Sequence, residues 1–306
     1  MGRSRHWVVA AAVAVFALAS AGAQAAGPPD EPDLEAMALA VGDFDGGAVV
    51  DIQRPVTPPP PFVGEYERFF RPGARLAGRR LLYAANIDIS LDDASTTQLA
   101  FSSLLQQLNT QAGRRAISNG LLSNLSRNTH GRVKVKSISI GRPVSVQLGQ
   151  GAFRMAIVLK TNVGRVELAV TGLRLDRAIG LIALAAYPRS RLTTGPPTLA
   201  TARLAKRFTA GFMLHNTVVP TVVGTPQQGQ ALTADPGHWA GGPDAFAYQW
   251  NRCAAAGTPC APVAGATAQT YVPTPADGGS RLSVTVTASN SISQSSATSV
   301  PGNPVP

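Results

Sequence analysis

Apolar residues recur at helical spacing in one long stretch of the chain, residues 92–125. Asp92 or Asp93 begins this stretch, and Gly113 and Gly120 are expected to divide it into shorter helices. Four leucines carry the helical spacing, namely Leu99, Leu104, Leu105 and Leu108. The pattern therefore predicts amphipathic helices in this part of the chain.

Runs of apolar and β-branched residues flank the helical stretch on both sides. Two further helices are expected: residues 33–40, capped by Asp33, and residues 196–212, where Pro196 and Pro197 stand near the start. The expected strands are residues 48–56, 65–70, 79–90, 132–140, 152–161, 164–175 and 177–187. This order predicts an α+β fold in which helices flank an antiparallel sheet.

The composition changes near residue 215, where charged residues give way to Gly, Pro, Ser, Thr, Ala and β-branched residues. Beyond that point short β-rich runs alternate with turn residues, and Leu282, Val284 and Val286 alternate with polar residues, which predicts a β-sandwich. The expected domains are a signal peptide at 1–26, an α+β domain at 27–216, an all-β sandwich at 217–300 and a Pro-rich tail at 301–306.

The region 218–300 resembles the bacterial Ig-like modules that repeat in secreted actinobacterial surface proteins. The phrases TVVGTPQQGQALTADPGHWAG, AYQWNRC and ADGGSRLSVTVTASN carry the likeness. The matching positions are Gly224, Pro226, Gly229, Leu232, Ala234, Tyr248, Trp250, Cys253, Cys260, Ala276, Asp277, Gly279, Leu282, Val284, Val286, Ala288 and Asn290. The resemblance implies that Trp250 is the core tryptophan and that the cysteine pair closes a hairpin. It also implies that VPGNPVP is similar to a linker between repeats.

Residues 30–215 resemble secreted sensor-type domains with a PsbP-like fold, in the order of their elements alone. The phrase AFRMAIVLKTNVGRVELAV, followed by another strand and a last helix, carries this likeness. The resemblance implies a domain that is not an enzyme. It assigns no functional residue.

The first 26 residues have the order of a secretory signal peptide. Arg3 and Arg5 precede an apolar run, and Ala23 and Ala25 precede the expected cleavage site. The apolar run has about 13 residues, whereas a helix that spans a membrane needs about 20. We therefore expect a secreted protein, associated with the cell surface or free of it, with no membrane span after cleavage.

Cys253 and Cys260 are the only cysteines of the chain. In an exported protein such a pair is expected to form a disulfide. Zinc would need about four ligands, and the four histidines show no metal-ligand spacing with the cysteines. A redox pair would favour two intervening residues. The pair is therefore expected to staple a hairpin, and no metal or cofactor is expected.

Positive charge is concentrated in the N-terminal domain, because residues 27–217 carry about +9 of the chain's +10. Arg132, Lys134 and Lys136 alternate along one expected strand and form a candidate surface for an anionic envelope polymer. A solvated strand face explains the same residues. Past Ser137 the alternation changes phase to Ile138 and Ile140, which predicts a bulge or a strand that becomes buried. Nucleic acid is not an expected partner, since aromatic residues make up only 6 % of the chain.

The segment GDFDGG has part of the spacing of a calcium-binding loop. Asp43, Asp45 and Asp51 would be the ligands, but Gly47 stands where an oxygen side chain is expected. A turn between a helix and a strand explains the same residues.

The histidines and the paired glutamates of the sequence give only weak indications of catalysis. His130 and His215 lie in no hydrolase motif, and His238 lies in the sandwich. Glu65 and Glu67 share one face of a strand, where paired carboxylates could act, but the neighbouring Arg68 and Arg71 suggest a salt-bridged outer face.

These patterns predict a secreted, non-catalytic protein in which an Ig-like spacer displays a ligand-binding or scaffold α+β domain at the cell envelope. One alternative is a binder of anionic envelope polymers, such as a wall teichoic-type polymer or an acidic glycan, through Arg132, Lys134 and Lys136. Another is a hydrolase of an undescribed type. A surface protein is a further expected partner.

Overall fold

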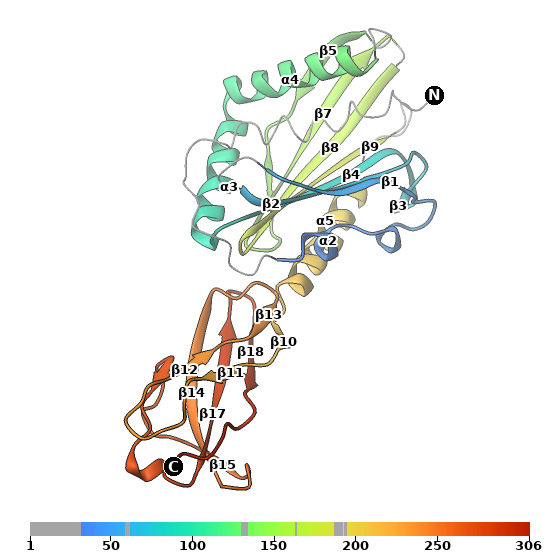
Figure 1. The fold of residues 1–306 in the computed structure, drawn as a ribbon. Coiled ribbons are helices and arrows are strands. Elements are labelled where there is room, and N and C mark those ends of the chain that lie inside the picture. Colours follow the sequence, from blue (N-terminus) through green and yellow to red (C-terminus); the bar gives the residue numbers. More distant parts are fainter. Residues whose placement is uncertain (1–31, 59–61, 130–133, 163, 187–191, 193–194) are drawn as a thin grey trace. The chain divides into compact units, whose positions relative to one another are not determined.

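The computed structural model describes residues 32–58, 62–129, 134–162, 164–186, 192 and 195–306 (Figure 1). The chain divides into two compact units, which consist mainly of Asp33–Gly211 and Phe212–Pro306. The division lies a few residues before the boundary expected at 216. Strands predominate in both units, and the longer helices lie in the first one.

The first unit contains a nine-stranded sheet, all of whose paired strands run antiparallel. Seven strands follow the order β1-β2-β4-β9-β8-β7-β5, while β3 pairs with β4 and β6 pairs with β7. The strands are β1 (Val50–Val56), β2 (Phe62–Phe70), β3 (Arg75–Leu76), β4 (Arg79–Leu91), β5 (Val135–Ile140), β6 (Val144–Val146), β7 (Gly151–Thr161), β8 (Gly164–Leu175) and β9 (Ala178–Ala186). The pairing of β4 with β9 joins parts of the chain that are about 100 residues apart in sequence.

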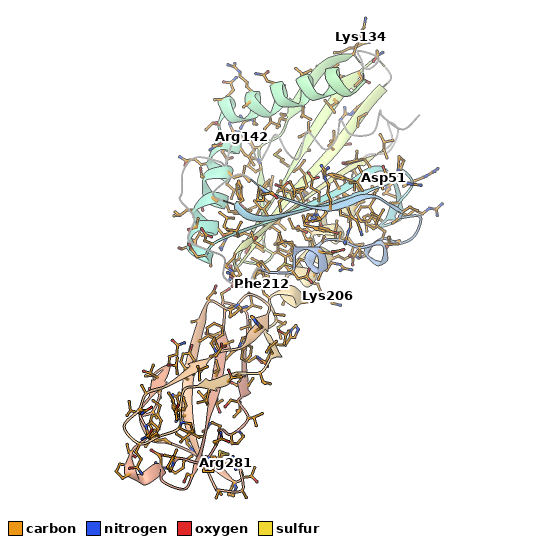
Figure 2. All side chains as sticks on the ribbon, in the orientation of Figure 1. Asp51, Lys134, Arg142, Lys206, Phe212 and Arg281 are labelled. Atoms are coloured by element: carbon orange, nitrogen blue, oxygen red, sulfur yellow. A yellow bond between two sulfur atoms is a disulfide. The ribbon has the colours of Figure 1, made fainter. Side chains whose placement is uncertain are left out.

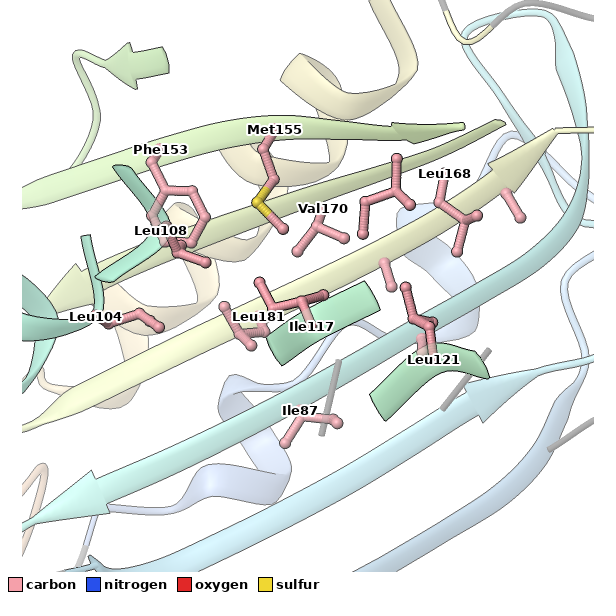
Figure 3. Packing of buried hydrophobic residues seen from close by; sticks show 14 of the residues in the cluster. Ile87, Leu104, Leu108, Ile117, Leu121, Phe153, Met155, Leu168, Val170 and Leu181 are labelled. Carbon is pink, nitrogen blue, oxygen red and sulfur yellow. The ribbon is translucent and has the colours of Figure 1, made fainter. Parts of the chain in front are cut away.

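Two helices, α3 (Ala94–Asn109) and α4 (Gln111–Thr129), pack their apolar sides on one face of this sheet. Asp93 caps α3, because its carboxylate accepts the N–H of Thr96 at 2.8 Å. Figure 3 shows the contact, in which helix residues meet residues of the strands. The cluster includes Ile87, Leu104, Leu108, Ile117, Leu121, Phe153, Met155, Leu168, Val170 and Leu181.

The opposite face of the sheet packs against α5 (Gly195–Gly211), beside which lies the short helix α2 (Leu34–Met37). Gly180 on β9 permits the close approach of α5, since a Cβ there would lie 2.7 Å from side-chain atoms of Leu204 and Phe208. The sheet is thus enclosed between two helical layers over β8 and β9.

The helical stretch divides at Thr110, before the glycine expected to divide it. Gly113 lies in the first turn of α4, where a Cβ would collide with the carbonyl oxygen of Gln107, and Gly120 lies inside α4 without ending it. Leu99 shares the spacing of the buried leucines but is 72 % exposed, and Phe101 lies in the core. Spacing therefore identified the helices better than it identified the buried side chains.

The second unit is built of short strands in three sheets, ordered β15-β14-β17-β18, β11-β12-β16 and β10-β13. The strands are β10 (His215–Val218), β11 (Thr221–Val223), β12 (Leu232–Asp235), β13 (His238–Ala240), β14 (Ala245–Cys253), β15 (Cys260–Pro262), β16 (Thr270–Tyr271), β17 (Arg281–Ser289) and β18 (Gln294–Thr298). Trp250 is fully buried at the centre of the core and stacks on Tyr271 with the ring centroids 5.5 Å apart.

Cys253 and Cys260 occupy paired positions of β14 and β15 and form a disulfide. A loop of this length should contribute about 2–3 kcal/mol to the stability of the second unit. Residues 301–306, expected as a tail, instead pack on this unit. Val305 is fully buried, and its N–H donates to the carbonyl of Ser280 at 2.8 Å.

Candidate functional site

The expected basic strand is only partly within the described residues. Lys134 and Lys136 are exposed, whereas Arg132 lies outside the described part of the chain. The N–H of Lys134 donates to Asn162 Oδ1 at 2.8 Å, which anchors the start of β5 at the turn after β7. Both lysines can therefore reach a ligand in solution.

The change of phase past Ser137 follows a β-bulge. Val135 pairs with Thr161 and Ser137 pairs with Lys160, so β5 has one more residue than β7 over this interval. The predicted bulge is confirmed. It ends the regular alternation of side chains on which the expected three-residue basic face depended.

A second pair of basic residues lies on the adjacent strands. Lys160 on β7 stands directly opposite Arg165 on β8, and both side chains are exposed. Like charges at directly opposite positions destabilise a sheet, by roughly 0.2–1 kcal/mol. Glu167, the nearest acid along β8, lies opposite Val158 instead. Glu167 shares this face of the sheet, and both basic side chains are open to solvent and to a ligand.

These basic residues belong to a long part of the sequence without acids. Residues 94–166 contain ten Lys and Arg and no Asp or Glu. This run forms α3, α4, the strands β5, β6 and β7, and the first residues of β8. Among the described side chains of the run, none forms an ion pair. We call this part of the first unit the acid-free half.

The carboxylates of the calcium-like segment are held by arginines. Three ion pairs form, of Asp43 with Arg207, Asp45 with Arg203, and Asp51 with Arg71. Two of these arginines lie on α5, so the pairs fasten the segment to that helix. The carboxylates of this segment are engaged by arginines, and the described residues contain no group of three His, Cys, Asp or Glu side chains that could hold a metal.

The expected partners of the glutamates on β2 also differ. Glu67 pairs with Arg54 on β1 at 2.9 Å, whereas Arg68 donates to the carbonyl of Leu39 at 3.1 Å. Burial, and then the charge of Glu67, raises the pKa of Glu65, while Arg54 lowers it. The two glutamates take part in cross-strand electrostatics at the β1–β2 edge.

The histidines are not assembled into a catalytic group within the described residues. His215 and His238 are exposed on β10 and β13 of the second unit, and His130 lies outside the described part. His215 Nδ1 lies 3.4 Å from the carbonyl oxygen of Met213.

A buried carboxyl group lies on β4. Asp88 is fully buried, and its Oδ1 accepts from Asn86 Nδ2 at 2.7 Å, whereas Oδ2 has no partner among the described residues. Burial raises the pKa of Asp88 well above its usual value, against the opposing effects of Asn86 and Arg68. Gly180, beneath α5, lies next to this carboxyl group. Asp88 is closed off from any substrate, and its contact is the hydrogen bond with Asn86 in the core.

An open hollow of about 220 Å³ lies at the border of the acid-free half, with Ala169 and Pro197 contributing from outside it. It lies between the loop from β5 to β6, strands β7 and β8, and the first turn of α5. Its lining includes Arg142, Val144, Arg154, Ala156, Ala169 and Pro197. Figure 2 labels Arg142, which lies away from Lys134 on the same unit.

The hollow exists because two small residues stand side by side on the floor of the sheet. Ala156 and Ala169 are directly paired across β7 and β8. Gly141 lies against the Ala156 carbonyl, which accepts its N–H at 2.8 Å, so the loop wall is close to the strand. Ala156 is exposed although β7 is an interior strand. Among the described residues, no helix or large side chain covers this apolar depression of the sheet.

Sequence reasoning missed this hollow. Its walls come from segments about 55 residues apart, and the pairing of Ala156 with Ala169 depends on the register of β7 and β8. The one available signal was the absence of acids across residues 94–166.

No protein-family model and no curated protein matches this sequence. Among solved structures, the chain is similar to the extracellular domain of PknH from Mycobacterium tuberculosis, with 7 % identity and a TM-score of 0.35. The match covers 60 % of this chain and 98 % of that one. Within the described residues, no helix combines the length and apolar character that crossing a membrane requires.

Proposed function

We propose that this protein is exported, lacks catalytic activity, and binds an anionic ligand of the cell envelope through the acid-free half of its first unit. The signal-like N-terminus and the disulfide of Cys253 and Cys260 support export. The ligand-binding role rests on charge and accessible surface rather than on a constellation of reactive groups.

The observation that carries the proposal is the segregation of charge in the first unit. Ten basic residues and no acid occur between residues 94 and 166, and none of their described side chains is neutralised by an ion pair. The exposed pair of Lys160 and Arg165 adds two positive charges at directly opposite positions of β7 and β8. Such a surface attracts anions over a distance set by ionic strength.

The second unit acts, in this proposal, as an Ig-like spacer, and the first unit has a PsbP-like fold. The buried Trp250, the hairpin disulfide and Asp277 support the Ig-like assignment. Asp277 is fully buried and accepts from Arg252, Tyr271 and Thr274, which ties together the elements around β17. The order of helices and strands supports the PsbP-like assignment.

Retention of the signal-cleaved chain on isolated cell envelope tests the proposal. We expect retention that falls steeply as salt rises, because binding of a polyanion releases its counterions. Replacing Lys160 and Arg165 by Gln should weaken retention and reduce its dependence on salt. A matched control removes two exposed basic residues from the other half, Arg75→Gln and Arg79→Gln.

Equal loss of retention in both double variants would show that only net charge matters and would contradict a role for the acid-free half. No retention at any salt concentration would contradict envelope binding altogether.

The basic strand is a second candidate surface, favoured by the exposure of Lys134 and Lys136. Changing Arg132, Lys134 and Lys136 to Gln should then reduce retention on an anionic polymer more than the Lys160 and Arg165 changes do. Unchanged retention would remove this candidate and leave the rest of the acid-free half.

A further inference from the structure

We propose that the hollow between β7, the loop from β5 to β6 and α5 binds a single-chain amphiphilic anion, with its apolar chain on the alanine floor and its carboxylate at Arg142 and Arg154. This inference deepens the proposed function and rests on it, because it identifies one class of anionic ligand and its place at the border of the acid-free half.

The rim of the hollow is positive and unopposed. Arg142 is exposed, and the part of the chain that the structure describes provides it with no hydrogen-bond or ion-pair partner and lines the hollow with no acid. A second guanidinium, that of Arg154, completes the rim. Two guanidinium groups without a carboxylate are complementary to an anionic head group, which they bind by charge-assisted hydrogen bonds.

Arg154 is already held in place by the protein. Its Nη1 donates to Thr198 Oγ1 at 3.0 Å, which connects β7 to the first turn of α5. The remaining N–H groups of the guanidinium stay available, since an arginine has five donors. A side chain that is fixed before binding loses less conformational entropy when the ligand arrives.

The floor and walls of the hollow are apolar. Ala156 and Ala169 form the floor, and Val144, which is 60 % exposed, stands beside them with Pro197 across the opening. Drug-sized ligands use cavities of roughly 300–1,000 Å³, and the hollow has only about 220 Å³. A single short hydrocarbon chain suits this space better than a ring system or a polymer segment.

Lys134 does not belong to this site. Eight residues of extended chain separate it from Arg142, a distance of about 25 Å at the rise of a β-strand. The basic strand and the hollow are therefore separate surfaces, and Lys134→Gln is a control that removes one positive charge without altering the hollow.

Titration of octanoate into the full signal-cleaved chain, with alanine and valine methyl groups isotopically labelled, tests the inference by NMR. We expect saturable shifts of the Ala156, Ala169 and Val144 methyl signals. Arg142→Gln and Arg154→Gln should each weaken binding about tenfold, as loss of a charge-assisted hydrogen bond does. Ala156→Leu should abolish binding by filling the hollow, and Lys134→Gln should leave the affinity unchanged.

Octanol and octylamine separate the contributions of chain and charge. Weaker binding of both than of octanoate supports an anion site, whereas equal binding of octanol overturns it. Butyrate should bind at least about tenfold more weakly than octanoate, because it buries fewer methylene groups.

The absence of saturable shifts would also overturn the inference. A variant is folded if its methyl signals outside the hollow match those of the unaltered chain. Failure of the site is distinct from failure of the proposed function. If octanoate does not bind the unaltered chain, and Ala156→Leu keeps its salt-sensitive retention on cell envelope, the proposed function stands and this site does not exist. If octanoate binds in the hollow but the chain is not retained on cell envelope, the site stands and the proposed function does not.

Discussion

The two halves of the first unit's sheet use positive charge for different purposes. Around β1, β2 and α5, arginines form ion pairs with carboxylates. The pairs are Arg54 with Glu67, Arg71 with Asp51, Arg203 with Asp45 and Arg207 with Asp43. Around β5, β6 and β7, none of the described basic side chains forms an ion pair with an acid. The difference teaches that net charge alone does not locate a binding surface, because paired and unpaired arginines contribute to it equally.

The same comparison separates structural from functional roles. A paired arginine satisfies a buried or half-buried acceptor, so its loss leaves that acceptor without a partner. An unpaired, exposed lysine supports no internal contact, so its loss should alter binding and leave folding intact. The following substitutions test this division.

The largest effect is expected at Arg68. Its Nη1 donates to the carbonyls of Ala38 and Leu39, and its Nη2 donates to the hydroxyl of Tyr66, within the core on the α2 side. Arg68→Met should reduce the free energy of unfolding of the first unit by about 2–4 kcal/mol. Chemical denaturation followed by helix circular dichroism measures this, because the long helices lie in the first unit.

Lys160→Met is the matched control in the acid-free half and should change the free energy of unfolding by less than about 0.5 kcal/mol. Similar losses in both variants would break the proposed division between the halves.

The next effect is a change in pH dependence at Asp88. Burial raises the pKa of this carboxyl group above its value in the unfolded chain, so its favourable contribution is complete below the ordinary pKa near 4 and is lost as pH rises through the raised value. Asp88→Asn keeps the shape and removes the ionisation. Between pH 5 and 9, the thermal midpoint of the first unit should fall less in this variant than in the unaltered chain.

Asp277 supplies the opposite case in the second unit. Burial would raise the pKa of Asp277, but hydrogen bonds from Thr274, Arg252 and Tyr271 outweigh it and lower the pKa. Its contribution is therefore present above the ordinary pKa and lost as pH falls through the lowered one. Tryptophan fluorescence reports this unit, because both tryptophans after the signal, Trp239 and Trp250, lie in it. If the stability of the first unit, followed by helix circular dichroism, and that of the second unit, followed by tryptophan fluorescence, changed with pH in the same direction, the opposite roles of Asp88 and Asp277 would be contradicted.

A smaller effect is expected at Arg207, which pairs with the mostly buried Asp43. Arg207→Gln should lower the free energy of unfolding by about 1 kcal/mol, as partly exposed ion pairs do. Lys206→Gln, at an exposed position on the same helix, should change it little. A double variant that also carries Asp43→Asn should lose no more than Arg207→Gln does if the two side chains act together.

The smallest effect has the opposite sign. Lys160→Glu replaces a repulsion across β7 and β8 with an attraction to Arg165, so it should stabilise the first unit by about 0.5 kcal/mol. The same change should weaken salt-sensitive retention on cell envelope. Gain of stability together with unchanged retention would show that the repulsive pair serves no ligand.

Most helices and strands could be predicted from the period of the apolar residues. The strands 152–161 and 164–175 were expected almost as they occur, because both are long runs rich in apolar and β-branched residues that a short turn separates. The short elements β3, β6, β13 and β18 were not expected. Two to five residues carry too little periodicity to distinguish a strand from a loop.

The candidate site was predicted in part. Its charge was visible in the sequence, and Lys134 and Lys136 are exposed as a ligand surface requires. The pairing of acids was not visible, because Asp43 and Arg207 are 164 residues apart. A carboxylate spacing that resembles a calcium loop therefore gave no information on what the carboxylates bind.

By itself the sequence determined the order of helices and strands, the concentration of positive charge before residue 217 and the cysteine staple, since each depends on residue type and local spacing. Only the tertiary structure decided which arginines are neutralised and where, within the described residues, the sheet has an apolar hollow. The pairing of Ala156 with Ala169 and the contact of Arg154 with Thr198 join distant segments, and strand register sets such contacts.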